Sequence, residues 1–513
     1  MIEYLEIEGL RGFGIKRKVE FAIPDGEKHG SGLTVLVGAN NSGKSTVLEA
    51  ISDLLQDFTP GGSIWASKST GTIEFTNNPE VPEILRNQMI PCKQNLEFAN
   101  PNPIAKSTVS YPRGKRNEIA KGKVNLFMKT NNGFFCLKSV ESMGSELDLS
   151  LEGDGVSVFI LSPKRYFEPF FGRNDSTQSR EDYLKNRRYQ RKGNIEFSQR
   201  IYKIQGSKES KNEYDELIGI VLGYDLDWNI EGNDNQQYYI NIKNGINNHS
   251  TEGVGDGIIS IMAIIDALYD SKSGDSIVID EPESSLHPAL QKRLYMLLEK
   301  FSVDRQIIIA THSPYFINSE AILNGSKICR FTKNRDGNID VFCSDKILSE
   351  NIKAITKDEH NIHVLGLDAK EIFFQEDGVV LVEGQEDIIY FKKLFDNIDN
   401  KIDGHFFGWG VGGAPKMVNV ARILDNLGYK KVMGILDADK AGSEAFQALN
   451  KEFNGEYLFI QIPAEDVRSK PSEKKAAKEG LFDLKHKFQT EKYGKAMNEL
   501  IDNANIYMRK SAE

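Results

Sequence analysis

The chain has no run of apolar residues that approaches the ~20 needed for a membrane-spanning helix. Its opening, MIEYLEIEGLRGFG, has no positively charged lead into an apolar segment and is not typical of a secretory signal. Net positive charge is also lacking: the formal net charge is −10, so a nucleic-acid partner would have to be held by local basic patches or metal ions. We therefore expect a cytoplasmic protein without a membrane partner.

Cysteine is scarce. The 513 residues include four cysteines, with no C-x-x-C pair, at Cys92, Cys136, Cys329 and Cys343. Scattered cysteines argue against a disulfide framework and against a zinc site, so all four are predicted to be plain core or surface thiols. There is no internal repeat or low-complexity tract. At this length, with 39% hydrophobic residues, the chain should fold as two or three domains.

A phosphate-binding loop stands near the start, in GLTVLVGANNSGKSTVLEAISDLL, residues 32–55. An apolar strand, a glycine-bearing loop and an amphipathic helix fit G-x-x-x-x-G-K-[ST], beginning at Gly38. In such a loop backbone N–H groups surround a phosphate, the lysine adds a point charge, and the hydroxyl after it can bind Mg²⁺. The predicted ATP contacts in this loop are Asn40, Asn41, Ser42, Gly43, Lys44 and Ser45.

Two later strands end in residues that suit the same nucleotide. DSIVIDEPESSLHP ends its strand at Asp280 and Glu281, a pairing that suits a Mg²⁺ ligand beside a base that polarises water. RQIIIATHSPYFI ends its strand at Thr311 and His312, where an imidazole could reach a γ-phosphate. The presence of these two segments argues against the interpretation that the glycine loop at Gly38 matches the phosphate-loop motif by chance.

A glycine-rich turn, STEGVGDGIIS, precedes the apolar helix IISIMAIIDALY. The order of phosphate loop, glycine turn, Asp-Glu pair and histidine resembles the ABC-type ATPases of the SMC and Rad50 kind. The resemblance implies that Gly255 and Gly257 close on ATP held by a second subunit, so that the protein is a homodimer or a larger homo-oligomer. It also implies that IEGLRGFG is the usual first strand, with Arg11 near the nucleotide.

The region from about 60 to 215 is irregular and is predicted to be an insert with a helical arm. Its segment SPKRYFEPFFGRNDSTQSREDYLKNRRYQRKGN interleaves arginines with aromatic residues. Cations for phosphate and rings for stacking could hold nucleic acid. A solvated helical arm or a dimer contact explains the pattern equally well, so both interpretations stay open.

A second domain is expected after a connector at 321–375. From residue 376 strands and helices alternate, which indicates a parallel sheet covered by helices. Acids follow two of the strands: Glu383 and Asp387 after VVLVEG, and Asp437 and Asp439 within GILDADKAG. The carboxyl ends of parallel strands are where such sheets place their sites. Four carboxylates without His or Cys suit Mg²⁺ or Mn²⁺, and therefore metal-assisted phosphoryl transfer.

Taken jointly, VEGQED, a glycine turn and LDADKAG resemble the Toprim domain of topoisomerases, primases and certain nucleases. A Toprim domain after an ABC-type ATPase resembles the OLD (overcoming lysogenization defect) family of ATP-dependent nucleases, a plan shared by Gabija-type and retron-associated phage-defence effectors. The resemblance implies that the four acids bind metals and that a downstream lysine neutralises the scissile phosphate. The candidates are Lys470, Lys474, Lys475 and Lys478, with Lys474 favoured; Glu465 and Asp466 could add metal ligands.

The prediction is an α/β chain with an ABC-type ATPase domain at 1–320 and a Toprim domain at 376–513. Its expected activity is that of an ATP-regulated DNA endonuclease in bacterial antiphage defence. The suggested partners, besides DNA and a second copy, are a reverse transcriptase with its retron nucleic acid, or a helicase. The alternative is a non-nucleolytic ATP-driven clamp or partner-binding effector, although clustered carboxylates would repel a polyanion that was only bound.

Overall fold

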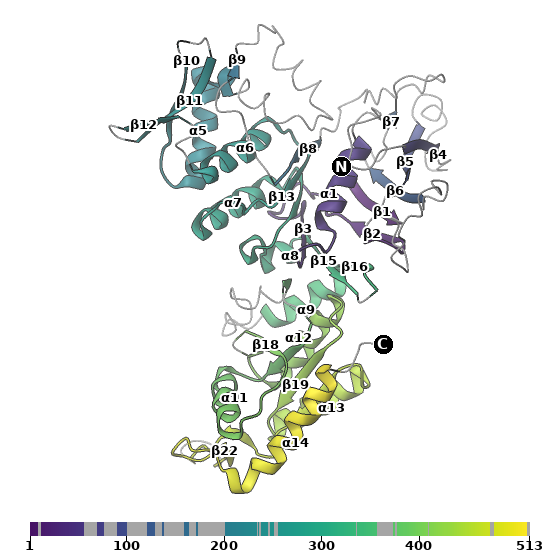
Figure 1. Ribbon diagram of the computed structural model, residues 1–513, viewed down its shortest axis with the longest axis vertical. Coiled ribbons are helices and arrows are strands. Elements are labelled where there is room, and N and C mark those ends of the chain that lie inside the picture. The colour runs from purple at the N-terminus through teal and green to yellow at the C-terminus, as the bar shows by residue number, and fades with distance from the viewer. Residues whose placement is uncertain are drawn as a thin grey trace, which may run out of the picture. The chain divides into compact units, whose positions relative to one another are not determined.

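The computed structural model describes residues 1–8, 12–55, 69–75, 90–99, 121–128, 136–137, 158–163, 171–172, 201–232, 234, 237–244, 247–250, 255–334, 336–356, 373–374, 377–408, 410–471 and 477–509. The chain divides into two compact units, unit 1 at Met1–Cys343 and unit 2 at Ser344–Glu513 (Figure 1). No helix within the described ranges is both long and apolar enough to cross a membrane.

Unit 1 is built on a central sheet of mostly parallel strands. In spatial order these are β16 (Ile339–Cys343), β15 (Lys327–Lys333), β3 (Leu33–Gly38), β14 (Gln306–Ala310), β13 (Ser276–Asp280) and β8 (Val158–Leu161), and only β16 runs antiparallel to its neighbour. Every residue of β3, β13 and β14 is buried. Such continuous apolar strands are stable only where helices or other layers cover both faces of the sheet.

The helices of unit 1 surround this sheet (Figure 1). They are α1 (Lys44–Leu55), α5 (Lys208–Leu222), α6 (Asp256–Asp270), α7 (Pro288–Phe301), the short α8 (Ser319–Leu323) and the 3₁₀ turn η2 (Pro314–Phe316). α1 contacts β3, β13 and β14, and α5 contacts α6 and α7. Arg293 of α7 donates to the carbonyls of Val221 (2.6 Å) and Leu222 (2.7 Å), which satisfies the C-terminal end of α5.

Two antiparallel sheets complete unit 1. The first has the order β2 (Arg17–Glu20), β1 (Ile2–Glu8), β6 (Lys121–Met128), β5 (Ile90–Ala99) and β4 (Ser69–Phe75), with β7 (Cys136–Leu137) on β5. The second joins β10 (Asp227–Gly232), β11 (Gln237–Asn244) and β12 (Asn247–Ser250), with β9 (Phe171–Gly172) on β11. Part of the region predicted as an irregular insert therefore extends the sheet that β1 begins. The arginine-aromatic segment lies, apart from Ser162, Pro163 and β9, outside the described residues.

The β15–β16 hairpin differs from two predictions. The residues from 321 were expected to begin a connector, but β15 pairs in parallel with β3 and the division between the units follows Cys343. The four cysteines were expected to be plain thiols, and that is wrong for Cys329 and Cys343, which form a disulfide. The antiparallel register sets these residues opposite each other with Cα atoms 4.0 Å apart, although 14 residues separate them in sequence. Spacing alone does not reveal such a cross-strand pair.

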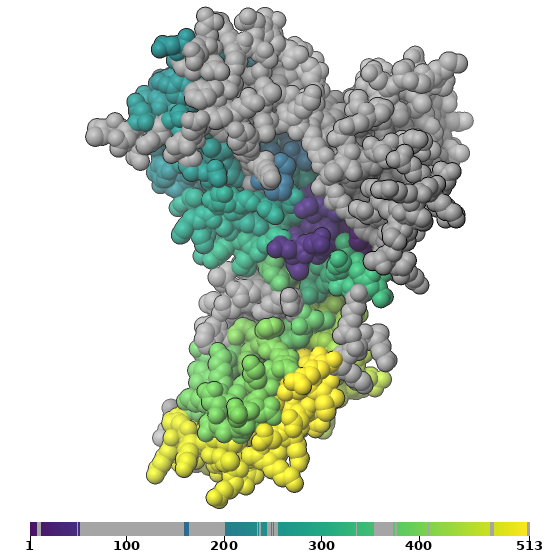
Figure 2. Space-filling view, viewed as in Figure 1, coloured from purple at the N-terminus to yellow at the C-terminus, as the bar shows by residue number. Residues whose placement is uncertain are grey.

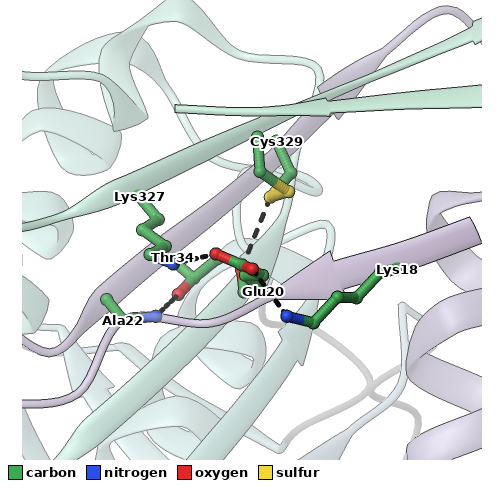
Figure 3. Close-up of a disulfide and its surroundings, with 7 residues drawn as sticks. Lys18, Glu20, Ala22, Thr34, Lys327 and Cys329 are labelled. Atoms are coloured by element: carbon green, nitrogen blue, oxygen red, sulfur yellow. Dashed lines mark hydrogen bonds and ion pairs between the residues drawn. A yellow bond between two sulfur atoms is a disulfide. The ribbon is translucent and has the colours of Figure 1, made fainter. Parts of the chain in front are cut away.

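The surroundings of the disulfide tie β15 to β2 (Figure 3). The Sγ of Cys329 lies 3.5 Å from the carbonyl oxygen of Glu20. The Glu20 carboxylate pairs with Lys18 (2.8 Å) on its own strand and with Lys327 (2.7 Å) on β15. These two ammonium groups lower the pKa of Glu20 to about 2. The hairpin is thus held to the N-terminal strands by ion pairs as well as by its backbone.

Unit 2 has a four-stranded parallel sheet in the order β18 (His405–Phe406), β17 (Val379–Val382), β19 (Val432–Leu436) and β20 (Leu458–Gln461). Its helices are α9 (Lys346–Thr356), α11 (Gln385–Ile398), α12 (Ala414–Asn426), α13 (Lys440–Phe453) and α14 (Thr490–Arg509). A two-stranded ribbon of β21 (Asp466–Arg468) and β22 (Gly480–Phe482) follows β20. The predicted α/β class is confirmed for both units.

The core of unit 2 includes its C-terminal helix. Met497, Ile501 and Ala504 of α14 are buried in one cluster with strand residues such as Val380 and Ile435. Figure 2 shows the C-terminal part of the chain, in yellow, along a flank of the green residues of the same unit. α9 contacts α12, so residues from the second half of the predicted connector also belong to unit 2.

Candidate active sites

The phosphate loop of unit 1 connects β3 to α1, which begins at Lys44. Its backbone is left-handed at Gly38 (φ 146°), Asn41 (φ 61°) and Gly43 (φ 99°). A Cβ on Gly38 would lie 2.3 Å from the carbonyl oxygen of Phe331, so only glycine allows the loop to approach β15 this closely. Asn40, Asn41 and Ser45 are exposed on this loop, whereas Ser42 is buried.

Lys44 is the buried cation of this loop, with 5% of its surface exposed. Its Nζ donates to the carbonyl oxygens of Gly38 (2.9 Å) and Ala39 (3.0 Å). Burial lowers the pKa of Lys44 to about 8, although the charges of Asp280, Glu283 and Glu281 favour its protonated form. A desolvated ammonium that rests on neutral carbonyls is better stabilised by an anion, and phosphate oxygens would supply one.

The predicted acids and histidine lie beside this lysine. Asp280 is buried at the end of β13, and Glu281 follows with a left-handed φ of 47° and accepts from the Ser284 hydroxyl at 3.0 Å. The pKa of His312 is lowered, first by burial and then by the charge of Lys44, while Glu281 acts in the opposite direction. These side chains meet because β3, β14 and β13 are neighbours that run in parallel and end on one edge.

Glu283 was not among the predicted residues. Its Oε2 accepts from the Thr311 hydroxyl (2.7 Å) and its Oε1 accepts from the backbone N–H of His312 (2.6 Å). Burial raises the pKa of Glu283. The signal in the sequence was the third acid of DEPE, which a search for one Asp-Glu pair passed over.

The glycine turn leads into α6, whose N-cap is Gly255. A Cβ on Gly257 would lie 2.6 Å from the carbonyl oxygen of Ser285, in the loop that follows the acids. Gly257 is therefore packed against Ser285 and Leu286 of its own subunit, whereas a Cβ on Gly255 would meet nothing within 4 Å. Arg11 lies outside the described residues.

The four predicted acids of unit 2 come from two neighbouring strand ends. Glu383 follows β17, and its Oε1 accepts from the backbone N–H of Asp437 (2.9 Å), which follows β19. Asp387, in the first turn of α11, accepts from the N–H of Gly384 (2.8 Å). Asp439 caps α13 by accepting from the N–H of Gly442 (2.8 Å). A Cβ on Gly442 would lie 2.1 Å from the Asp437 carbonyl oxygen and 3.1 Å from Glu383 Oε1, so glycine lets α13 close on the cluster.

Mutual repulsion marks these acids as a cluster. Burial raises the pKa of Asp437 to about 9, and the charges of Asp387, Glu383 and Asp466 add to the shift. Burial also raises the pKa of Asp387 to about 7, with further contributions from Glu383 and Asp466. Burial opposes the charged form of Asp439 as well, but the Gly442 N–H and Lys478 outweigh it and lower its pKa. The centre of the cluster is therefore short of positive charge.

A fifth acid and two lysines come from the segment after β20. Asp466 is 2% exposed, and its Oδ2 lies 2.7 Å from Lys470 Nζ and 3.8 Å from Lys478 Nζ. Lys478 also pairs with Asp439 at 2.5 Å. The favoured Lys474, like Lys475, lies outside the described residues, whereas Lys470 and Lys478 both reach the cluster. Glu465 is exposed.

Glu386, next to Asp387 on α11, lies at the rim of the cluster. It pairs with Arg468 (2.8 Å) and Lys470 (3.2 Å), so it holds two basic groups beside Asp466. Because exposed pairs of this kind contribute little to stability, their position matters more than their strength.

The donor set fits a divalent cation by its chemistry. Carboxylate oxygens are the ligands that Mg²⁺ and Mn²⁺ prefer, and the raised pKa values of Asp387 and Asp437 indicate acids that a cation would stabilise. Among the described residues no three acidic, histidine or cysteine side chains are arranged to hold an ion as they stand. The ammonium of Lys478 lies instead between Asp439 and Asp466.

One protein-family model matches residues of the first unit. Residues 33–101 and 154–318 match the family model described as AAA domain, putative AbiEii toxin, Type IV TA system. Over these residues, which all lie in unit 1, the chain is therefore similar to an AAA domain.

Three curated proteins are similar over part of their length. The Old nuclease of Escherichia phage P2 is 28% identical over 170 residues (31% of this chain, 27% of that protein). Endonuclease GajA of Bacillus cereus (strain HuB5-5) is 27% identical over 201 residues (33% and 29%). Uncharacterized protein MJ1542 of Methanocaldococcus jannaschii is 39% identical over 72 residues (14% and 9%). The chain spans less than a third of the length of each of these relatives.

Solved SMC head domains also match. One bound to the C-winged helix domain of ScpA has a TM-score of 0.37 and 17% identity, covering 67% of this chain and 98% of that one. The SMC head domain from Thermotoga maritima has a TM-score of 0.32 and 14% identity, covering 67% and 99%. These TM-scores are low, so the fold of unit 1 is defined by its own strand order.

Proposed function

We propose that this chain is an ATP-regulated, divalent-metal-dependent DNA endonuclease of the OLD family, in which unit 1 binds ATP and unit 2 is a Toprim nuclease domain. The observation that carries the proposal is the five-acid cluster of unit 2, with the pKa of Asp437 raised to about 9, in a chain that also has a phosphate loop. The similarity to the Old nuclease and to endonuclease GajA supports the same activity.

In unit 1, Lys44 leaves the loop carbonyls for the β- and γ-phosphates of ATP. Ser45 and Asp280 are the residues that would hold its Mg²⁺, Glu281 orients a water molecule, and His312 faces the γ-phosphate. Gly255 and Gly257 of a second copy, together with Arg11, complete the site, so the active form is a homodimer or a larger homo-oligomer.

In unit 2 the residues that would hold Mg²⁺ or Mn²⁺ are Glu383, Asp387, Asp437, Asp439 and Asp466. Bound there, these ions supply charge for the attacking and leaving oxygens of a phosphodiester. Lys478 pairs with Asp439 and Asp466. If cations neutralised those acids, its ammonium would be available to a DNA phosphate. Lys478 is therefore the phosphate-neutralising lysine that the described residues support, while Lys474, favoured from the sequence, lies outside them.

The alternative is an ATP-driven clamp or partner-binding effector that uses unit 2 only for binding. The acid cluster favours the nuclease, because buried carboxylates with raised pKa values cost folding free energy. A surface that merely held DNA would gain nothing from that cost.

The nuclease proposal is tested with supercoiled plasmid and Mg²⁺ or Mn²⁺. The wild-type chain should cut, and Glu383→Ala and Asp437→Ala should not, while both variants still bind ATP. Glu444→Ala, an exposed change on α13, is the matched control. Cleavage that persists in both active-site variants would reject this assignment.

Control of cleavage by ATP is a separate test. Lys44→Ala should change the rate of plasmid cutting in the presence of ATP, and equal rates with and without nucleotide in the wild type would reject the coupling. The role in antiphage defence is tested by plating phage on cells that express the chain with a neighbouring reverse transcriptase or helicase gene. Asp437→Ala should abolish any protection.

A further inference from the structure

The loop from Glu281 to Leu286 connects β13 to α7 and has an unusual backbone. Glu281 (φ 47°) and Ser285 (φ 63°) are both left-handed, a conformation that costs a residue other than glycine about 1 kcal/mol or more. Gln291 of α7 donates to the carbonyl of Leu286 at 2.7 Å, which holds the far end of the loop. A loop that keeps two such residues must be stabilised by its contacts.

Glu283 makes the contacts that reach the segment following the neighbouring strand β14. One carboxylate oxygen accepts from the Thr311 hydroxyl and the other from the His312 N–H. The segment that contains Thr311 and His312 is also held through Ser313. The Ser313 hydroxyl donates to Gln291 (2.6 Å), and the Ser313 N–H donates to Thr311 Oγ1 (3.0 Å). The backbone that carries the His312 imidazole is therefore held by the acid loop.

A carboxylate is a costly group to place here. Glu283 is partly buried, Glu281 is close enough to repel it, and the phosphates expected at Lys44 would repel it further. A glutamine would avoid the charge but has one acceptor oxygen, whereas Glu283 accepts from two donors with two oxygens. The charge therefore has a purpose connected with residues 311 and 312.

We propose that Glu283 is a positioning residue that holds the His312 imidazole beside the γ-phosphate position, so that unit 1 distinguishes ATP from ADP. The inference rests on the proposed binding of ATP by unit 1. Glu283 itself does not touch the nucleotide. It acts through the Thr311–His312 backbone, which moves when the two hydrogen bonds are lost.

The test compares the dissociation constants of ATP and ADP for the full-length chain and its variants. Glu283→Ala should reduce the preference for ATP over ADP about tenfold, the usual loss for a hydrogen bond to a charged group, and should leave ADP affinity unchanged. Glu283→Gln, which keeps one acceptor, should lose less. Glu320→Ala, an exposed change on α8 of the same unit, should lose nothing.

A double variant separates positioning from general stability. If Glu283 acts through His312, adding Glu283→Ala to His312→Ala should reduce the ATP preference no further. The inference would be overturned if Glu283→Ala reduced the ATP preference equally in the wild-type and His312→Ala backgrounds. It would also be overturned if Glu283→Ala weakened the binding of ATP and ADP equally and lowered the Tm. Should Glu283→Ala fail to fold, Glu283→Gln in the same two backgrounds decides. A wild-type chain that binds neither nucleotide would reject the proposed function and this inference together.

Discussion

The two candidate sites use the same ingredients, carboxylates and a lysine at the ends of parallel strands, in opposite ways. In unit 1 the lysine itself is buried: Lys44 rests on backbone carbonyls and burial lowers its pKa to about 8. In unit 2 the acids are buried: Asp437 has its pKa raised to about 9, and Lys478 lies at their edge as a counter-ion.

The difference indicates which ligand each site lacks. A desolvated cation that donates to neutral carbonyls is stabilised by an incoming anion, as in a phosphate site. A desolvated group of acids, only partly balanced by lysines, is stabilised by incoming cations, as in a divalent-metal site. Fold position does not distinguish the two sites, because both lie at carboxyl ends of strands.

The largest effect is expected when a substitution removes the cation of unit 1. Lys44→Ala should weaken ATP binding by about a hundredfold, since charge-assisted hydrogen bonds to phosphate are lost. Mn²⁺ binding by unit 2 should be unaffected. Calorimetric titration of both ligands checks this, and weaker Mn²⁺ binding in Lys44→Ala would contradict the separation of the two sites.

The converse change removes an anion from unit 2. Asp437→Asn should weaken Mn²⁺ binding about tenfold or more. It should also raise the Tm of the metal-free protein at pH 8, by roughly 2–4 °C for each kcal/mol gained.

The sign of that gain follows from the raised pKa of Asp437. Its folded-state pKa of about 9 exceeds the ordinary value of 3.8, so the folded protein retains this proton and loses stability as pH rises between those values. The advantage of Asp437→Asn should therefore grow from pH 5 to pH 8, as thermal melts in EDTA can show. An advantage that is the same at both pH values would contradict it.

The pH dependence of nucleotide binding sharpens the comparison further. With the pKa of Lys44 lowered to about 8, the ammonium is mostly protonated at pH 7 and mostly neutral at pH 9. ADP affinity, measured in EDTA so that no metal contributes, should fall about tenfold between these values. Lys44→Met should abolish the dependence, and a wild-type affinity that stays constant would show that Lys44 keeps its ordinary pKa.

The smallest effect is expected at the rim of the unit 2 cluster. Glu386→Gln should change the Tm by less than about 2 °C, because the pairs with Arg468 and Lys470 are partly exposed. It should leave ATP binding unchanged. Loss of Mn²⁺ binding in this variant would place Glu386 inside the metal site rather than at its edge.

Much of both sites could be predicted from the sequence because motifs mark strand ends. The residues around Lys44, Asp280 and His312, and the acids around Glu383 and Asp437, lie together because neighbouring parallel strands end on one edge. What could not be predicted depends on contacts between distant segments.

The choice of lysine illustrates that limit. Lys470 and Lys478 are neighbours because an isolated antiparallel β-bridge joins their backbones next to the β21–β22 ribbon. No local sequence pattern reveals this pairing. Glu283 was missed for a related reason, since its partners are 28 and 29 residues away, directly after β14. The connector was placed too early because β15 pairs with β3, a strand near residue 35, and β16 pairs with β15.

The cross-strand disulfide has a practical consequence. Cys329 and Cys343 are opposite each other only when β15 and β16 pair in the described register, and β15 also lines the phosphate loop through Phe331 and Gly38. The rate at which a thiol reagent labels these two cysteines in reduced protein therefore reports whether the strands next to the nucleotide site are folded. A purified sample can be graded by that rate before any activity is measured.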